Sequence, residues 1–168
     1  LSTGGIGTIL TSQSFVDKAD LGELVERIRQ TGVKVVNIED VRVAITRTEK
    51  VKAFLFWRRP LAARKADDPA VILFTSGSEG VPKGVALSHV NILSNICQAS
   101  SVLDLNESDK LFNAMPVFHS FGLTIGMLLP LVRGVNMFLY PSPLHYRVVP
   151  ELIYDCDSTI MLGTDTFF

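Results

Sequence analysis

The sequence predicts an α/β fold in which a mostly parallel sheet is flanked by helices. Three observations support this prediction. A strand, a helix and a second strand follow one another near the start of the chain. Residues 70–74 form a continuous apolar run, which is typical of a strand covered on both faces. A glycine-rich loop then joins this run to another short strand, so the loop is expected between two strands.

The first elements are read from hydrophobic spacing. Residues 8–11 are expected to form a short buried strand, and residues 34–38 a second one. A helix between them is expected to end at Gly32, a typical C-cap residue. Residues 46–57 are ambiguous but compatible with a helix, which Pro60 would end. The first helix is indicated by four apolar residues at helical spacing: Leu21, Leu24, Val25 and Ile28.

The later elements follow the glycine-rich loop. A short strand is expected at residues 85–87, and Ser88 is a good N-cap for the helix behind it. Another strand is expected at residues 135–140, a helix near residues 148–154 and a final strand at residues 159–162. The apolar face of the helix after Ser88 is expected to consist of Val90, Leu93, Ile96, Cys97 and Leu103.

Residues 111–132 contain no charged side chain, and a stretch of this length can span a bilayer. Asn113, Pro116 and His119 interrupt it, however, and its purely apolar part is only about a dozen residues. A buried helix is therefore the favoured interpretation, with a membrane span as the alternative.

Composition and charge exclude several classes of protein. The 16 basic and 17 acidic residues give a net charge of -1, so no basic field for nucleic acid exists. Two cysteines, Cys97 and Cys156, are too few for a disulfide framework or a zinc site and fit a reducing compartment. The first residue is Leu1 and the chain stops directly after an expected strand and turn, so a piece of a longer protein is expected.

The charge changes sign along the chain. Residues 1–66 carry a net charge of +5 and residues 67–168 a net charge of -6, which divides the chain into two predicted segments of one domain. A basic cluster lies just before the division, and it either faces anionic lipid headgroups or an acidic partner, or is a solvated connector. The cluster consists of Arg58, Arg59, Arg64 and Lys65.

Residues 75–84 favour a polyphosphate site. Three glycines let backbone N–H groups converge on an anion, three hydroxyls add donors, and Lys83 adds a mobile positive charge. The loop lacks the Gly-Lys-Ser/Thr of a Walker A motif, and a strand rather than a helix follows it. The alternative, a plain hairpin turn, needs two to five residues rather than ten.

Two motifs carry a resemblance to a known family. Phe-Thr-Ser-Gly-Ser-x-Gly-x-Pro-Lys-Gly at residues 74–84 and Met-Pro-Val-Phe-His-Ser-Phe-Gly at residues 115–122 resemble, in order, two motifs of the adenylate-forming enzymes. The resemblance implies part of that superfamily's N-terminal domain, with ATP and Mg²⁺ as cofactors. It also implies that Thr75 lies near Mg²⁺. The phosphates would be lined by Thr75, Ser76, Gly77, Ser78, Glu79, Gly80 and Lys83.

The second motif would, by the same resemblance, line the site of the acyl carboxylate. His119 is expected to orient the carboxylate as a neutral hydrogen-bond donor. Without the motif, the favoured interpretation would be a core histidine whose hydrogen bonds are made inside the protein. No catalytic residue is expected in this chain, because the adenine, ribose and catalytic-lysine motifs of the superfamily are absent. The expected acyl-site residues are Phe118, His119, Phe121 and Gly122.

From about Pro69 onward the sequence is more narrowly similar to bacterial bifunctional enzymes that combine an acyl-[acyl-carrier-protein] synthetase with a 2-acylglycerophosphoethanolamine acyltransferase. Glu79, where the superfamily usually has threonine, and residues 140–147 carry this similarity. It implies a ligase joining a fatty acid to acyl carrier protein. The parent enzyme would also reacylate a lysophospholipid at the cytoplasmic face of the bacterial inner membrane.

Two alternatives differ from this interpretation. A long-chain fatty acyl-CoA synthetase would perform the same chemistry with coenzyme A as the thiol acceptor. A module of another class would dock on a membrane surface without catalysis, through the basic cluster and the uncharged stretch. Lys83→Ala distinguishes a ligase from a docking module. The substitution should abolish pyrophosphate release by a ligase, whereas vesicle binding by a docking module should persist.

Overall fold

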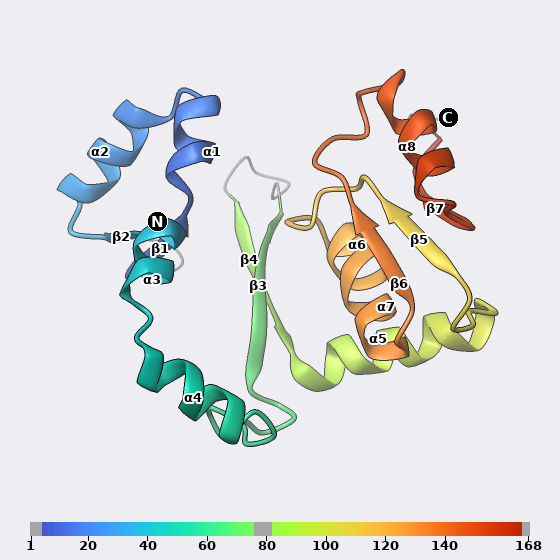
Figure 1. Ribbon diagram of the computed structural model, residues 1–168, viewed down its shortest axis with the longest axis horizontal. Coiled ribbons are helices and arrows are strands. Elements are labelled where there is room, and N and C mark those ends of the chain that lie inside the picture. The colour runs from blue at the N-terminus through green and yellow to red at the C-terminus, as the bar shows by residue number, and fades with distance from the viewer. Residues whose placement is uncertain (1–4, 76–81, 166–168) are drawn as a thin grey trace. The chain divides into compact units, whose positions relative to one another are not determined.

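The computed structural model describes residues 5–75 and 82–165 (Figure 1). The chain divides into two compact units, Leu1–Ala63 and Arg64–Phe168. An α/β architecture is confirmed, and most of the strand pairs are parallel: β1 with β2, β5 with β6 and β5 with β7, whereas β3 and β4 are antiparallel. The assignment of residues 1–66 and 67–168 to one domain stays a prediction.

The first unit contains the predicted strand, helix and strand, but the first strand is not buried as expected, because none of residues 8–11 is buried and Leu10 is 63% exposed. Parallel pairing joins β1 to β2, with Thr8 opposite Lys34. Gly32 has the positive φ of +81° that its predicted role at the helix end requires. Two short helices, α1 and α3, were not predicted. The elements are β1 (Thr8–Thr11), α1 (Gln13–Lys18), α2 (Gly22–Gln30), β2 (Lys34–Asn37), α3 (Ile38–Ala44) and α4 (Arg47–Leu55).

Glu39, in the first turn of α3, ties that turn to the start of α1. Its carboxylate accepts a hydrogen bond from the Ser12 hydroxyl at 2.6 Å and from the Gln13 N–H at 3.1 Å. The Ser12 bond is the main cause that lowers the pKa of Glu39 to about 2, with backbone N–H groups adding to it. A charged carboxylate thus holds the two helix starts beside the parallel strands.

The second unit contains a hairpin, a three-stranded sheet and four α-helices among its described residues. In the sheet, β5 lies between β6 and β7 and is parallel to both. The sequence did not predict β5. The elements are β3 (Pro69–Thr75), β4 (Lys83–Ser88), α5 (His89–Val102), β5 (Lys110–Asn113), α6 (Ser120–Leu123), a π-helical segment (Thr124–Leu128), α7 (Leu129–Arg133), β6 (Asn136–Leu139), α8 (Val148–Asp155) and β7 (Ile160–Leu162).

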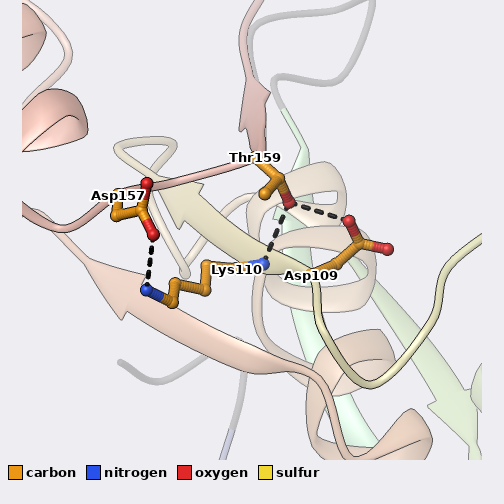
Figure 2. A network of polar contacts seen from close by, with 4 residues as sticks. All are labelled: Asp109, Lys110, Asp157 and Thr159. Atoms are coloured by element: carbon orange, nitrogen blue, oxygen red, sulfur yellow. Dashed lines mark hydrogen bonds and ion pairs between the residues drawn. The ribbon is translucent and has the colours of Figure 1, made fainter.

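Polar contacts fix the register of β5 against β7 (Figure 2). The Thr159 hydroxyl donates to Asp109 at 2.8 Å and accepts from the Lys110 N–H at 3.0 Å. The Lys110 ammonium pairs with Asp157 at 3.1 Å. Hydrogen bonds from the Asn106 N–H and then from Thr159 lower the pKa of Asp109. These contacts join the start of the central strand to the turn that precedes the last one.

Burial of the hairpin differs from the prediction. The run at residues 70–74 was expected to be covered on both faces, but Ile72 is 50% exposed and Phe74 is 48% exposed. Among the described residues β3 pairs with β4 alone, and one face of this two-stranded ribbon packs against buried side chains of α5 and α7. The opposite face, with Ile72 and Phe74, has no such cover, so the prediction was wrong on this point.

The helix after Ser88 begins as predicted but buries a different face. Ser88 and Asn91 form a capping box, which fixes where α5 starts. Ile92 and Ile96 are the buried residues of the helix, one turn apart, because they face the hairpin and Leu129. Of the predicted face, Ile96 alone is buried, whereas Val90, Leu93, Cys97 and Leu103 are exposed.

The uncharged stretch forms the buried helix that was favoured from the sequence. Residues 120–133 run without a break through α6, the π-helical segment and α7. Leu123, Gly126, Leu129 and Pro130 are buried in it. In the described part of the chain, every helix is too short or too polar to cross a membrane.

Candidate functional site

Thr75 and Lys83 are the described ends of the predicted phosphate loop. They pair directly across the hairpin, so their side chains leave the ribbon on the same face. Both residues are exposed, and the Thr75 hydroxyl lies 3.5 Å from the Lys83 carbonyl oxygen. The pairing of Val71 with Leu87 puts the same face on the core of the unit. The other predicted loop residues, Ser76, Gly77, Ser78, Glu79 and Gly80, lie outside the described residues.

His119 is placed by the start of α6. It is the N-cap residue, its N–H donates to the Pro116 carbonyl oxygen at 3.0 Å, and its Nδ1 accepts from the Phe121 N–H at 3.4 Å. An accepting Nδ1 puts the proton of the neutral ring on Nε2, which can donate to a carboxylate. The side chain is exposed, so the alternative of a core histidine is wrong.

Asn113 is a buried residue that holds the backbone of the second motif. It was not predicted as a site residue from the sequence. The residue is 1% exposed. Its Oδ1 accepts from the Met115 N–H at 2.9 Å, and its Nδ2 donates to the Gly122 carbonyl oxygen at 3.4 Å. A buried amide between the two ends of the motif thus fixes the turn that presents His119. The available signal was a lone polar residue between the apolar pairs at residues 111–112 and 114–115.

Two glycines let the backbone come close to this amide. A Cβ atom on Gly122 would lie 2.2 Å from the Pro116 carbonyl oxygen, and one on Gly126 would lie 2.2 Å from Nδ2 of Asn113. Gly126 lies in the π-helical segment, a geometry that is frequent at functional sites. Gly122 therefore supports the site through packing under the turn.

A cavity of about 430 Å³ brings the two predicted motifs together. Its walls come from the end of β3 and from the turn before α6, which are more than 40 residues apart in the sequence. Polar groups from both motifs, Thr75 and His119, meet apolar side chains there. The lining residues are Leu73, Phe74, Thr75, Phe118, His119 and Ser120.

Apolar space continues on both sides of this cavity. Phe118, which is 81% exposed, also borders a cavity of about 360 Å³ with Met115, Val117 and Leu139. Phe121 borders another, of about 310 Å³, beside Leu87 and Ile92. Residues of the turn at 115–121 therefore line three cavities, one with a mixed polar and apolar lining and two that are mainly apolar.

Tyr140 belongs to the segment that carries the narrower similarity. Its hydroxyl lies 2.8 Å from Nδ1 of His145, and the two rings meet edge to face. The Tyr140 N–H donates to the Asn113 carbonyl oxygen at 2.8 Å. This residue thus links the end of β6 to the backbone of Asn113, whose side-chain amide holds the second motif.

The residues that are present fit a magnesium-bound triphosphate. In the described ranges, no cluster of three or more His, Cys, Asp and Glu side chains could hold a metal by itself. An exposed hydroxyl and an exposed ammonium group, side by side at the end of the hairpin, suit a polyanion whose own oxygens supply most of the magnesium ligands. Thr75 is the residue that would contact the ion.

The family follows from comparison with known proteins. The fold is that of part of an adenylate-forming domain. The model of the AMP-binding enzymes matches residues 1–168, and the chain belongs to this family. Its members use ATP with magnesium.

Three of the curated relatives that match the chain are ligases by name. A long-chain-fatty-acid–CoA ligase of Bacillus subtilis is 42% identical over 78 residues, which are 45% of this chain and 14% of the relative. A sulfoacetate–CoA ligase of Cupriavidus necator is 36% identical over 80 residues, or 48% and 16%. The acyl-CoA ligase cnsG of Penicillium expansum is 30% identical over 121 residues, or 64% and 25%. The chain thus spans at most a quarter of the length of these relatives.

Solved structures show the same fold. One of them is O-succinylbenzoate coenzyme A synthetase from Bacillus subtilis, in complex with ATP and magnesium ion. The match covers 99% of this chain and 31% of the synthetase chain, with a TM-score of 0.75 and 20% identity. The structure of McyG A-PCP complexed with phenylalanyl-adenylate covers 92% of this chain and 23% of its own, with a TM-score of 0.73 and 24% identity. The predicted fold, part of the N-terminal domain of an adenylate-forming enzyme, is confirmed.

Proposed function

We propose that this chain supplies the phosphate-binding and carboxylate-binding part of an ATP-dependent ligase that activates a fatty acid as its acyl-adenylate and then transfers the acyl group to a thiol. The observation that carries the proposal is the cavity shared by Thr75 and His119. Both residues line one space, which supports a role for Thr75 at the phosphates and for His119 at the carboxylate, because a carboxylate that attacks the α-phosphate must lie beside it.

On the phosphate side, Lys83 acts through its charge. Pyrophosphate gains negative charge as it leaves, and a fixed ammonium group on the loop lowers the cost of that charge. When bound with ATP, Mg²⁺ would neutralise further phosphate charge, with Thr75 as its contact on this chain. The hairpin register keeps the threonine and the lysine side by side for this purpose.

On the acyl side, His119 would hold the substrate carboxylate by a hydrogen bond from Nε2. The ring is fixed because Nδ1 already accepts from the Phe121 N–H. Apolar space beside Phe118 and Phe121 suits a hydrocarbon chain better than a polar acid. These features support a fatty acid as the substrate.

Two thiol acceptors are in question. Coenzyme A is supported by the named activities of the relatives, among them a long-chain-fatty-acid–CoA ligase. Acyl carrier protein is supported by the sequence similarity at Glu79 and residues 140–147. The further steps of that second proposal, lysophospholipid reacylation and a place at the cytoplasmic face of the bacterial inner membrane, rest on the sequence similarity alone.

The experiment is thioester formation by the whole parent enzyme with ATP, magnesium and a long-chain fatty acid. Acyl carrier protein and coenzyme A are offered separately, and pyrophosphate release is followed at the same time. Lys83→Ala should abolish pyrophosphate release with either acceptor. Lys34→Ala, an exposed lysine on β2, is the matched control and should retain the full rate.

The outcomes separate the proposals. Transfer to acyl carrier protein would establish the narrower one, and transfer to coenzyme A alone would establish the acyl-CoA synthetase. Undiminished pyrophosphate release by Lys83→Ala would contradict the role of the loop. Preference for a short polar acid over a long-chain fatty acid would contradict the substrate class.

A further inference from the structure

Helix α4 and the turn after it present an apolar and basic surface to solvent. This α4 surface comprises residues 47–63, and every one of them is exposed. Phe54 is 80% exposed, Trp57 is 72% exposed and Leu61 is fully exposed. Large apolar side chains at such exposure mark a surface that another body covers.

The helix has local support only. Thr46 and Glu49 form a capping box at its start, but α4 buries none of its nine residues. An isolated helix of this length is marginal in water, and most helices gain their stability by burying an apolar face. Val51, Phe54 and Leu55 lie three and four residues apart and form such a face. A partner is therefore required for this face to be buried.

Positive charge surrounds the exposed aromatic rings. Five cationic side chains and one carboxylate, Glu49, lie in residues 47–63. Arg58 stacks over the Trp57 ring at 4.9 Å, and Arg59 stacks over the Phe56 ring at 5.0 Å. The ion pairs found among the described residues involve none of the five cations. Their charge remains available to an anionic partner.

A cavity in the same surface combines both features. It measures about 530 Å³ and lies on the side of α4 where the chain turns back after the helix. Apolar walls from Phe56, Trp57 and Leu61 meet two cations there, Lys52 and Arg59, which outnumber the single carboxylate of Glu49 in the lining. Such a combination suits a molecule with an anionic head beside a hydrocarbon body.

We propose that the α4 surface docks the protein on an anionic phospholipid bilayer. Exposed tryptophan and phenylalanine beside arginine are typical of side chains at the boundary between headgroups and acyl chains. A folded protein partner would bury the rings but would also need acidic groups opposite five cations. A bilayer that contains anionic lipid supplies both the apolar layer and the negative charge. This proposal is independent of nucleotide binding and goes beyond the ligase chemistry.

The chain carries a built-in reporter for the test, because Trp57 is its single tryptophan. The full chain is mixed with vesicles of phosphatidylglycerol and phosphatidylethanolamine, and with neutral phosphatidylcholine vesicles. Binding is measured by flotation, and Trp57 emission is recorded. We expect binding to the anionic vesicles that falls as salt rises, with a blue shift of Trp57 emission and quenching by brominated acyl chains.

Two double variants test the charge and the apolar contact separately. Arg58→Glu with Arg59→Glu should weaken binding at least about 30-fold, because each cation near an anionic surface contributes about fivefold. Phe54→Ser with Leu55→Ser should weaken binding at least tenfold and keep the reporter. Lys18→Glu with Arg27→Glu, at exposed positions of α1 and α2, changes the charge equally and should alter binding less than about threefold.

Misfolding is excluded by circular dichroism and by the mobility of each variant on gel filtration. Equal binding to neutral vesicles, equal weakening by the control pair, or unchanged Trp57 emission would overturn the proposal. A dimer in solution that Phe54→Ser with Leu55→Ser dissociates would overturn it in favour of a second copy. Pyrophosphate release by the parent enzyme reports on the ligase proposal separately, since none of these residues lies in the phosphate or acyl site.

Discussion

The two halves of the candidate site are held by different forces. At the end of the hairpin, Thr75 and Lys83 are exposed and are placed by backbone pairing, with one long contact from the Thr75 hydroxyl to the Lys83 carbonyl oxygen. At the turn before α6, His119 is also exposed, but buried Asn113 and the close approach at Gly122 hold the backbone beneath it. The phosphate half is thus the polar end of a two-stranded ribbon, whereas the acyl half lies on the surface of a packed core.

This difference shows which part of the site serves the reaction and which part serves the stability of the fold. A phosphate loop must admit a large solvated polyanion, so its ends stay open and its side chains contribute little to packing. A carboxylate must be held at one distance from the α-phosphate, so the turn that presents His119 needs a rigid base. Substitutions in the hairpin should therefore change the reaction, whereas substitutions beneath the turn should change the fold first.

Lys83→Ala gives the largest expected effect and bears on the hairpin half. Loss of one preorganised charge at the leaving group should lower the rate of pyrophosphate release in the parent enzyme about 100- to 1000-fold. Because the side chain is exposed, the free energy of unfolding of the chain should change by less than about 0.5 kcal/mol. Steady-state kinetics and urea denaturation measure the two quantities. A large loss of stability would contradict the separation.

Gly122→Ala should reverse this pattern. Its new methyl group would meet the Pro116 carbonyl oxygen at 2.2 Å, so the backbone must move and the chain should lose about 3 kcal/mol of stability. Gly22→Ala is the matched control, since a Cβ atom there meets nothing within 4 Å. Urea denaturation of the chain checks both variants. Equal stability of the two would show that the turn has no rigid base.

Asn113→Ala tests the buried amide with a smaller effect. The Met115 N–H and the Gly122 carbonyl oxygen would lose their partner in a buried place, at a cost of about 2 kcal/mol. Asn136→Ala removes an exposed amide from β6 and should cost less than about 0.5 kcal/mol. In the parent enzyme, we expect Asn113→Ala to raise the KM for the fatty acid. A lowered kcat with an unchanged KM would argue against positioning.

The sequence predicted the parts of the fold that depend on local signals. Ser88 marked the start of α5 because a capping box is a local arrangement, and Gly32 marked a helix end because positive φ favours glycine. Residues 148–154 had enough apolar periodicity to predict α8, which is observed at Val148–Asp155. Both motifs are recognisable from the order and spacing of their residues alone.

Features set by distant packing could not be found in this way. Strand β5 has only four residues, with Lys110 and Asn113 at its ends, so its pattern is too short to read. The buried face of α5 depends on where the hairpin and α7 meet it, and Ile92 was therefore missed. Asn113 gains its role from Gly122 and Met115, which are brought to it by the turn.

The smallest expected effect is the pH dependence of the stability of Thr159→Val. Backbone pairing in the hairpin does not titrate, whereas the register of β5 involves the Asp109 carboxylate. Hydrogen bonds from the Asn106 N–H and from Thr159 lower the pKa of Asp109, so its stabilising contribution is complete above the unfolded pKa of about 4 and is lost as pH falls through the lower folded pKa. Removing the hydroxyl should lower the free energy of unfolding near neutral pH, and this difference from the unsubstituted chain should shrink below about pH 4. Urea denaturation between about pH 7 and pH 3 measures it. Thr31→Val is the control, because the Thr31 hydroxyl donates to a carbonyl oxygen, and its difference in stability should be constant with pH. A constant difference for Thr159→Val as well would show that the carboxylate does not hold the strand.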